Sequence, residues 1–156
     1  MKLTLESMRS SLAQELKPAY LISGDEPLLV AEAADAVRER ARAAGFLERE
    51  VYFIERVSDW PDVLAGANNL SLFGSRKLLE LRLPAAKPGV AGAKAIAQLL
   101  EQSDPDTVIL MLTGRLDRDA QNAAWVRAFT SRGAWLPVWP IDAARLPAWL
   151  GARARF

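Results

Sequence analysis

Short continuous apolar runs alternate with amphipathic segments along most of the chain. The apolar runs have the length and composition of strands that are buried on both faces of a sheet. The segments between them repeat apolar positions at helical spacing, as Leu5, Met8 and Leu12 do in the first. The predicted strands cover residues 19–24, 51–55, 77–83, 107–112 and 134–139, and the predicted helices cover residues 5–16, 27–44, 59–67, 93–102 and 118–132.

Regular alternation of strands with helices predicts the fold class. Each helix provides the crossover that brings the chain back to begin a strand in the same direction as the one before. The sequence therefore predicts an α/β fold, with a five-stranded parallel sheet and helices on both faces.

Residues at the ends of the predicted helices support these boundaries. Pro27 stands in a first helical turn, where its missing N–H costs nothing. We expect side-chain caps at the beginning of three helices and glycine at the end of two. The expected caps are Asp25, Ser58 and Asp117, and the expected end residues are Gly45 and Gly133.

The pattern changes after Pro140. Asp142 can cap one more amphipathic helix, and the sequence ends at Phe156 with that helix barely complete. We therefore expect one domain over residues 1–140 and the beginning of a further domain over residues 141–156.

Composition removes several classes of chemistry. The 156 residues include no Cys and no His, which argues against disulfides, thiolate nucleophiles, thiolate zinc sites and histidine bases. The formal charge of +1 gives no basic field of the kind that nucleic-acid binding usually needs. No apolar run has the length of a membrane span and no signal peptide is visible, so a cytoplasmic location without membrane contact is expected.

The loop after the first strand does not suit a nucleotide. In an open parallel sheet this loop usually binds phosphate, and a P-loop there needs a second glycine, a lysine and a hydroxyl. Here the loop "SGDEPLL" has one glycine and two carboxylates, Asp25 and Glu26, for which helix capping is the simpler interpretation. The third strand lacks a terminal acidic pair, because Glu80 lies inside it and is followed by Arg82. No nucleotide, metal or other cofactor is expected.

The stretch "NNLSLFGSRK", residues 68–77, places three large apolar side chains where a polar turn is expected. Asn68-Asn69 and Gly74-Ser75 bracket the run as a turn, and two basic residues separate it from the next strand. Short apolar runs usually fold back onto their own core. The alternative is a compact anchor for a partner protein, formed by Leu70, Leu72 and Phe73.

The stretches "YLISGDEPLLVAEAADAVR" (20–38), "NNLSLFGSRKLLELRLP" (68–84), "AQNAAWVRAF" (120–129) and "LPAWLGARAR" (146–155) together resemble the delta subunit of the bacterial DNA polymerase III clamp loader. The resemblance covers nearly the whole chain, and the apolar turn is its most specific part. It implies a AAA+-like domain without a functional P-loop, followed by a helical lid domain of which residues 141–156 would be the start. It also implies that Leu70, Leu72 and Phe73 bind the sliding clamp and help to open the ring.

The resemblance further implies a subunit without catalytic residues that belongs to the polymerase holoenzyme. Its partners would be the beta sliding clamp, the gamma/tau and delta-prime subunits, and primed DNA only within the complex. Two other functions stay open from the residues alone. One is an atypical nucleotide-binding domain, and the other is a hydrolase that uses carboxylates, which the absence of His, Cys and G-x-S-x-G opposes.

Several other aromatic and basic residues have ordinary interpretations. Trp125 and Phe129 are four residues apart on a helix and are expected in the core, and packing is the expected role of Trp135 and Trp139. Four arginines are expected on a solvated surface, with DNA or a neighbouring subunit as the alternative contact. They are Arg115, Arg118, Arg127 and Arg132.

Overall fold

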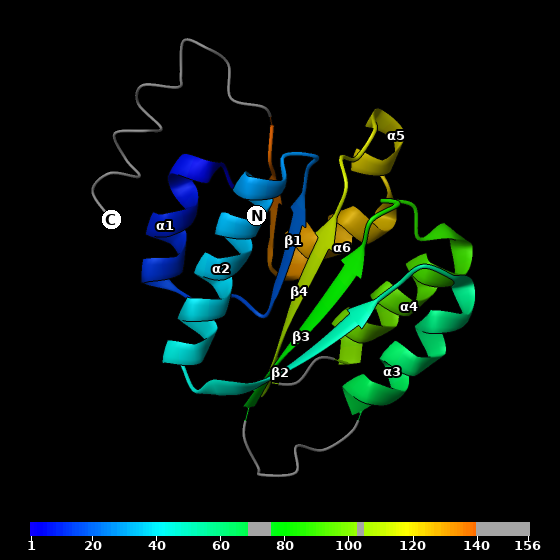
Figure 1. The fold of residues 1–156 in the computed structure, drawn as a ribbon, viewed down its shortest axis with the longest axis horizontal. Helices are drawn as coiled ribbons and strands as arrows, with labels where there is room; N and C mark the ends of the chain where they lie inside the picture. The colour runs from blue at the N-terminus through cyan, green and yellow to red at the C-terminus, as the bar shows by residue number, and fades with distance from the viewer. Residues whose placement is uncertain (69–75, 103–104, 140–156) are drawn as a thin grey trace.

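A computed structural model describes residues 1–68, 76–102 and 105–139. One five-stranded sheet forms its centre, in the order β2-β3-β4-β1-β5, and every neighbouring pair of strands is parallel (Figure 1). The strands are β1 (Ala19–Ser23), β2 (Phe46–Phe53), β3 (Arg76–Leu83), β4 (Thr107–Thr113) and β5 (Ala134–Pro137). The predicted α/β class and parallel sheet are confirmed.

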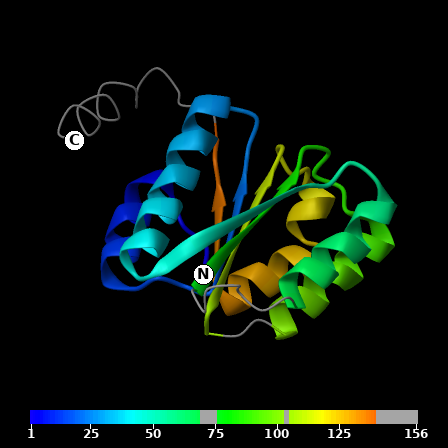
Figure 2. The ribbon, with the colours of Figure 1, turned by 60° about the horizontal axis from the view of Figure 1, so that its bottom comes forward.

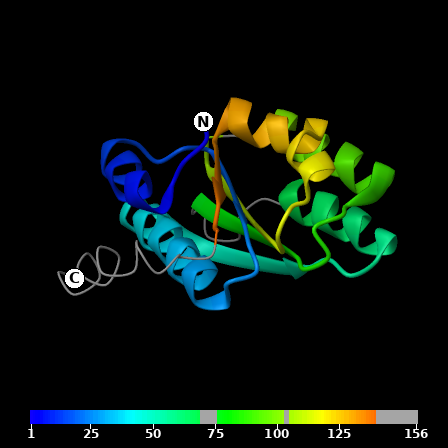
Figure 3. The same cartoon turned by 90° about the horizontal axis from the view of Figure 1, so that it is seen from above.

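Helices cover both faces of the sheet, as Figure 2 and the view from above in Figure 3 show. One face carries α1 (Leu5–Gln14) and α2 (Pro27–Ala43). The other face carries α3 (Trp60–Asn68), α4 (Gly89–Gln102) and α6 (Ala124–Arg132). Two one-turn helices, η1 (Val57–Asp59) and α5 (Arg118–Gln121), complete the described part. Within it, no helix has the length and apolar character needed to cross a membrane.

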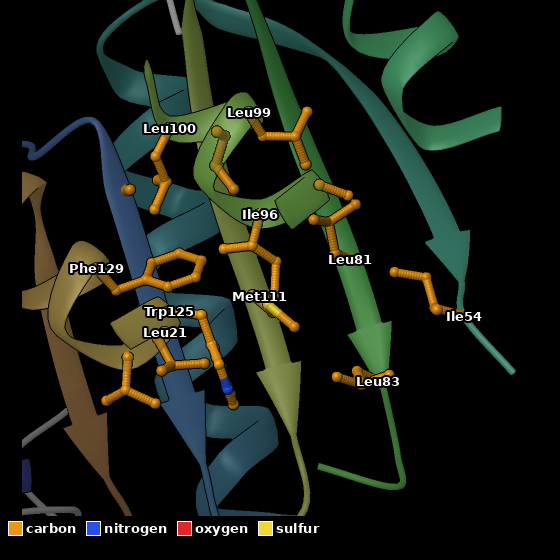
Figure 4. Close-up of a cluster of buried hydrophobic side chains, with 14 of the residues drawn as sticks. Leu21, Ile54, Leu81, Leu83, Ile96, Leu99, Leu100, Met111, Trp125 and Phe129 are labelled. Carbon is orange, nitrogen blue, oxygen red and sulfur yellow. The ribbon is translucent and has the colours of Figure 1, made fainter. Parts of the chain in front are cut away.

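The larger core lies between the sheet and the layer formed by α3, α4 and α6. The two central strands are buried along both faces, as their uninterrupted apolar runs predict. Trp125 and Phe129 of α6 lie in this core, which confirms their expected role. Figure 4 shows how side chains from three strands meet those of α4 and α6, among them Leu21, Leu81, Met111, Ile96 and Leu100.

Some predicted boundaries are wrong. Strand β2 begins at Phe46 rather than at residue 51, because its charged residues Glu48, Arg49 and Glu50 hide the strand pattern. Charges are common on such edge strands, where they discourage pairing with another chain. Helix α4 begins at Gly89 rather than at residue 93.

The helix predicted over residues 118–132 is two helices. Helix α5 stops at Asn122, whose side chain Nδ2 donates to the Arg118 carbonyl. Helix α6 then begins at Ala124, and the Arg127 guanidinium donates to the Asn122 carbonyl from its Nε and Nη2 atoms. A short polar side chain that bonds nearby backbone ends a helix in this way.

The predicted caps are correct in part. Asp117 caps α5 by accepting the N–H of Ala120 at 2.7 Å, and Gly133 follows α6. Asp25 does not cap α2, because Glu26 occupies the N-cap position and no side chain accepts a bond there. Ser58 lies inside η1 rather than immediately before α3, and the Asp59 carboxylate accepts the N–H groups of Glu55 and Arg56.

We predict that Gly133→Ala destabilises the domain by about 2–3 kcal/mol, since insertion of volume into a close contact has that order of cost. A Cβ atom at this position would lie 1.9 Å from the carbonyl oxygen of Ala19, and backbone cannot move aside as a flexible side chain can. The melting temperature should fall by about 5–10 °C. Ser131→Ala, at an exposed position of the same helix, is the control and should change it little.

Candidate functional site

The loop between β1 and α2 is short and closely packed. It consists of only Gly24, Asp25 and Glu26, because β1 ends at Ser23 and α2 begins at Pro27. The N–H of Gly24 already donates to the Thr113 carbonyl at 3.2 Å. A Cβ atom on Gly24 would lie 2.8 Å from the carbonyl oxygen and 2.9 Å from the Cβ of Val138. Backbone beyond β5 therefore fills the space above this glycine.

The N-terminus of α2 is also poorly suited to an anion. Pro27 has no N–H, and the exposed side chains of Asp25 and Glu26 bring negative charge to this end of the helix. A triphosphate at this position would meet two carboxylates instead of a lysine.

A fully buried carboxylate lies at the centre of β3. Glu80 is 0% exposed, and three guanidinium groups bind its two oxygens. The Nε atoms of Arg38 and Arg82 donate at 2.8 Å, and Arg49 donates from Nε at 3.2 Å and from Nη2 at 3.1 Å. Strands β2 and β3 and helix α2 are thus joined by one ionic cluster, which we call the Glu80 cluster.

The arginines of the Glu80 cluster keep its carboxylate ionised. Burial alone would raise the pKa of Glu80, but hydrogen bonds from Arg38, Arg49 and Arg82 lower it from 4.5 to about 2. The carboxylate therefore stays ionised near neutral pH and carries no proton to donate. Because arginines occupy both of its oxygens, it is also a poor ligand for a nucleotide-bound Mg²⁺.

Three of the four arginines singled out by sequence have local partners. Arg127 binds the Asn122 carbonyl, and Arg132 donates from Nη1 to the Leu100 carbonyl at 3.1 Å. Arg115 lies over the ring of Trp139 at 5.6 Å from its centroid, while Arg118 is exposed. All four arginines are exposed, which agrees with the predicted solvated surface.

The two tryptophans near the last strand differ. Trp135 is buried, and its Nε1 donates to the Ser23 hydroxyl at 3.0 Å, so packing explains it as predicted. Trp139 is 42% exposed, and the same prediction for it is wrong. It follows Val138, the residue that lies against the loop after β1, and its ring lies against Arg115.

The predicted clamp-binding residues Leu70, Leu72 and Phe73 lie outside the described residues, but the two ends of their segment are described. Helix α3 ends at Asn68 and strand β3 begins at Arg76. The Arg76 guanidinium donates from Nε to Asp106 at 3.1 Å and from Nη1 to the Ala44 carbonyl at 3.4 Å. The beginning of β3 is thereby attached to the end of α2 and to the beginning of β4.

A buried lysine joins the two ends of this segment. Lys77 is 4% exposed, and its Nζ donates to the Gly66 carbonyl in the last turn of α3 at 2.8 Å. The same Nζ atom lies 3.7 Å from the carboxylate of Glu50 on β2. Sequence inspection marked Lys77 only as a basic residue beside the turn and did not predict this contact.

Comparison with known proteins identifies the family. A family model described as DNA polymerase III, delta subunit, matches residues 20–138. The chain belongs to the DNA polymerase III delta subunit family. The resemblance found in the sequence is therefore confirmed, and the family is a component of the polymerase III holoenzyme.

Two curated relatives carry the same name. The chain is 34% identical over 150 residues to DNA polymerase III subunit delta of Escherichia coli (strain K12), covering 96% of this chain and 44% of the relative. It is 26% identical over 120 residues to the subunit of Haemophilus influenzae, covering 77% of this chain and 35% of the relative. The chain thus spans less than half the length of the relatives that it matches.

Solved structures support the fold assignment. The Bacillus subtilis DNA clamp loader delta protein (YqeN) superposes with a TM-score of 0.69 at 18% identity, over 93% of this chain and 45% of that one. The Aeropyrum pernix ORC1 protein, solved in complex with DNA, gives a TM-score of 0.52 at 16% identity, over 97% and 47%. The delta-subunit chain therefore has a AAA+-like fold.

We predict that Glu80→Gln destabilises the delta-subunit domain by about 3 kcal/mol at pH 7, because removal of one partner from a buried ionic cluster leaves the others uncompensated. The folded-state pKa of Glu80 is depressed from 4.5 to about 2. Its contribution is therefore full above pH 4.5 and is lost as the pH falls toward 2. Urea unfolding of both proteins from pH 7 to pH 2.5 measures this. A difference in stability that is the same at every pH would contradict the assignment.

We also predict that the chain does not bind ATP with Mg²⁺, because the short loop after β1 offers neither a phosphate cradle nor a lysine. Isothermal titration calorimetry at micromolar to millimolar ATP should give only heats of dilution. Saturable, magnesium-dependent heat at micromolar ATP would show that the interpretation of this loop is wrong.

Proposed function

We propose that this chain binds a ring-shaped sliding clamp and helps to open the ring for loading onto DNA during replication. It acts as a clamp-loader subunit without chemistry of its own. The observation that supports the proposal most is membership of the delta-subunit family over residues 20–138, a region that includes the apolar turn.

Leu70, Leu72 and Phe73 are the proposed clamp-binding residues. Burial of an aliphatic or aromatic side chain of this size contributes roughly 1.5–3 kcal/mol, so three of them supply several kcal/mol before ordering costs. Binding alone does not open a ring. The anchor must also bind the open state of the clamp more tightly than the closed state.

The proposed domain organisation follows the same family. Residues 1–140 form the AAA+-like domain that carries the clamp-binding turn, and residues 141–156 are the start of a helical lid domain. The proposed partners are the beta sliding clamp and the gamma/tau and delta-prime subunits, with primed DNA bound only within the complex.

An atypical nucleotide-binding domain is the second candidate. Its support is the AAA+-like fold, in which the strand order places the loop after β1 between the ends of β4 and β5. The length of that loop, its two carboxylates and the contact of Gly24 with Val138 oppose it. The clamp-binding function is therefore favoured.

We predict that Leu72→Ala combined with Phe73→Ala leaves the melting temperature nearly unchanged and weakens clamp binding by at least about a hundredfold. A loss of ~3 kcal/mol at an interface corresponds to more than that factor. The measurements are thermal melting by circular dichroism and surface plasmon resonance with the sliding clamp of the same organism.

Leu81→Ala is the matched control. Leu81 is 0% exposed on β3, so its truncation should cost about 2–5 kcal/mol of stability and leave the affinity of the folded protein unchanged. The opposite result for the turn variant, a large fall in melting temperature with normal clamp affinity, would mean that the turn belongs to the core of the domain.

A further inference from the structure

Part of the sheet is left open on the face that carries α1 and α2. Strand β2 begins beside the end of α2 and runs away from it, so among the described elements no helix of this face covers the last residues of the strand (Figure 1). Val51 pairs in register with Glu80, which Arg38 of α2 reaches, so both strand residues lie on this face. Phe53 and Arg82, two residues further along each strand, therefore share the same face.

An aromatic ring and two guanidinium groups are in contact with solvent here. Phe53 is 60% exposed, and the guanidinium of Arg82 lies over its ring at 5.2 Å from the centroid. The side chains of Arg49 and Arg82 are 45% and 37% exposed. We call the surface formed by Arg49, Phe53 and Arg82 the open face.

The open face carries more positive charge than the Glu80 carboxylate requires. One guanidinium would balance the charge of Glu80, yet three contact it. Asp35 on α2 pairs with Arg38, so the three arginines and the two carboxylates leave one positive charge in excess. Because Glu80 is 0% exposed, its negative charge lies beneath the guanidinium groups. A partner that approaches the open face therefore meets the arginines before it meets this carboxylate.

Both exposed arginines keep hydrogen-bond donors that the domain does not use. Arg82 binds Glu80 through Nε, and Arg49 binds it through Nε and Nη2. Within residues 1–68, 76–102 and 105–139, no group accepts a hydrogen bond from the Nη atoms of Arg82 or from Nη1 of Arg49. A guanidinium that is held along one edge presents its remaining donors in a fixed direction, which suits the recognition of a phosphate group.

We propose that the open face binds single-stranded DNA, with Arg49 and Arg82 on phosphate oxygens and the ring of Phe53 against a base. The inference rests on the proposed function, in which primed DNA is bound within the complex, and adds a surface of this chain that contacts the unpaired part of that DNA. Because the formal charge of the chain is only +1, the affinity of the chain alone is weak and depends on salt.

The exposed ring favours a single strand over other anionic partners. The bases of a single strand can stack on an aromatic side chain, whereas the bases of a duplex are already stacked on one another. An acidic protein segment would match the arginines, but its carboxylates bring no planar group for Phe53. The pairing of Phe53 with Arg82 thus corresponds to the combination of stacking and backbone contact that single-strand binding uses.

The test measures the fluorescence anisotropy of a labelled oligothymidylate titrated with the chain at low ionic strength. We expect a dissociation constant on the order of 100 μM. Contacts with two phosphates should give a slope of about −1.4 when the logarithm of the binding constant is plotted against that of the salt concentration. Phe53→Ala should weaken binding at least about fivefold through loss of stacking. Leu47→Ala is its matched control, since Leu47 is a 66% exposed apolar residue of the same strand, and it should bind normally.

A second pair of variants tests the charge. Arg49→Gln should weaken binding and reduce the salt slope to about −0.7, because one phosphate contact is lost. Arg118→Gln removes the same charge from an exposed arginine outside the open face and should change neither quantity. Circular dichroism establishes that each variant is folded. If Arg49→Gln does not fold, the comparison of Phe53→Ala with Leu47→Ala decides the inference.

Four results would overturn the inference. They are no saturable binding of oligothymidylate, binding that the variants of the open face leave unchanged, tighter binding of a duplex of the same length, and equal competition by polyglutamate. The last of these would assign the open face to an acidic protein segment. Clamp binding is measured in parallel by surface plasmon resonance. Failure to bind DNA beside normal clamp binding refutes this inference alone, whereas normal clamp binding by Leu72→Ala with Phe73→Ala refutes the proposed function whatever the DNA result.

Discussion

The common direction of the five strands determines which parts of this molecule can meet. In a parallel sheet all strands begin at one end of the sheet and finish at the other. Each connection must therefore run back along the length of the strands, across one face of the sheet. The loop after β1 lies at the end of the sheet where the strands finish, and the last turn of α3 meets β3 at the end where the strands begin. The position that binds phosphate in related folds is therefore separated from the contact between Lys77 and α3 by the length of the sheet. Substitutions at one end of the sheet need not disturb the other end.

The fold class and most elements could be predicted from sequence because the central strands are uniformly apolar. Strands β1 and β4 are buried along both faces, and nothing in their sequences competes with that interpretation. The edge strand β2 was placed too late because the charged residues that suit an edge also interrupt the pattern. Helix caps were harder to predict, since several polar residues stand near each boundary and only the backbone geometry decides which of them is used.

The polar interior could not be predicted. Glu80 and Lys77 lie in the otherwise apolar strand β3. The periodicity of this strand indicates on which face of the sheet each side chain lies, but it does not show whether another element covers that face. Apart from Arg82, which is two residues from Glu80 on β3, their partners lie on β2, α2 and α3, far away in the sequence. The spacing of arginines along α2 gives no sign that Arg38 reaches β3. For the proposed site, sequence and family likeness indicate the apolar turn, whereas the residues that hold its two ends become visible only in the folded chain.

The lysine contact at the end of α3 also has an electrostatic consequence. The aligned peptide dipoles of a helix leave a partial negative charge of about half an elementary charge at its C-terminus. Here that end carries the ammonium group of Lys77 at 2.8 Å from a terminal carbonyl, so much of the partial charge is compensated inside the domain. An apolar partner surface that approaches the turn therefore does not have to cover an uncompensated helix end, a group that would otherwise retain water. The contact thus makes the surroundings of this helix end easier to dehydrate.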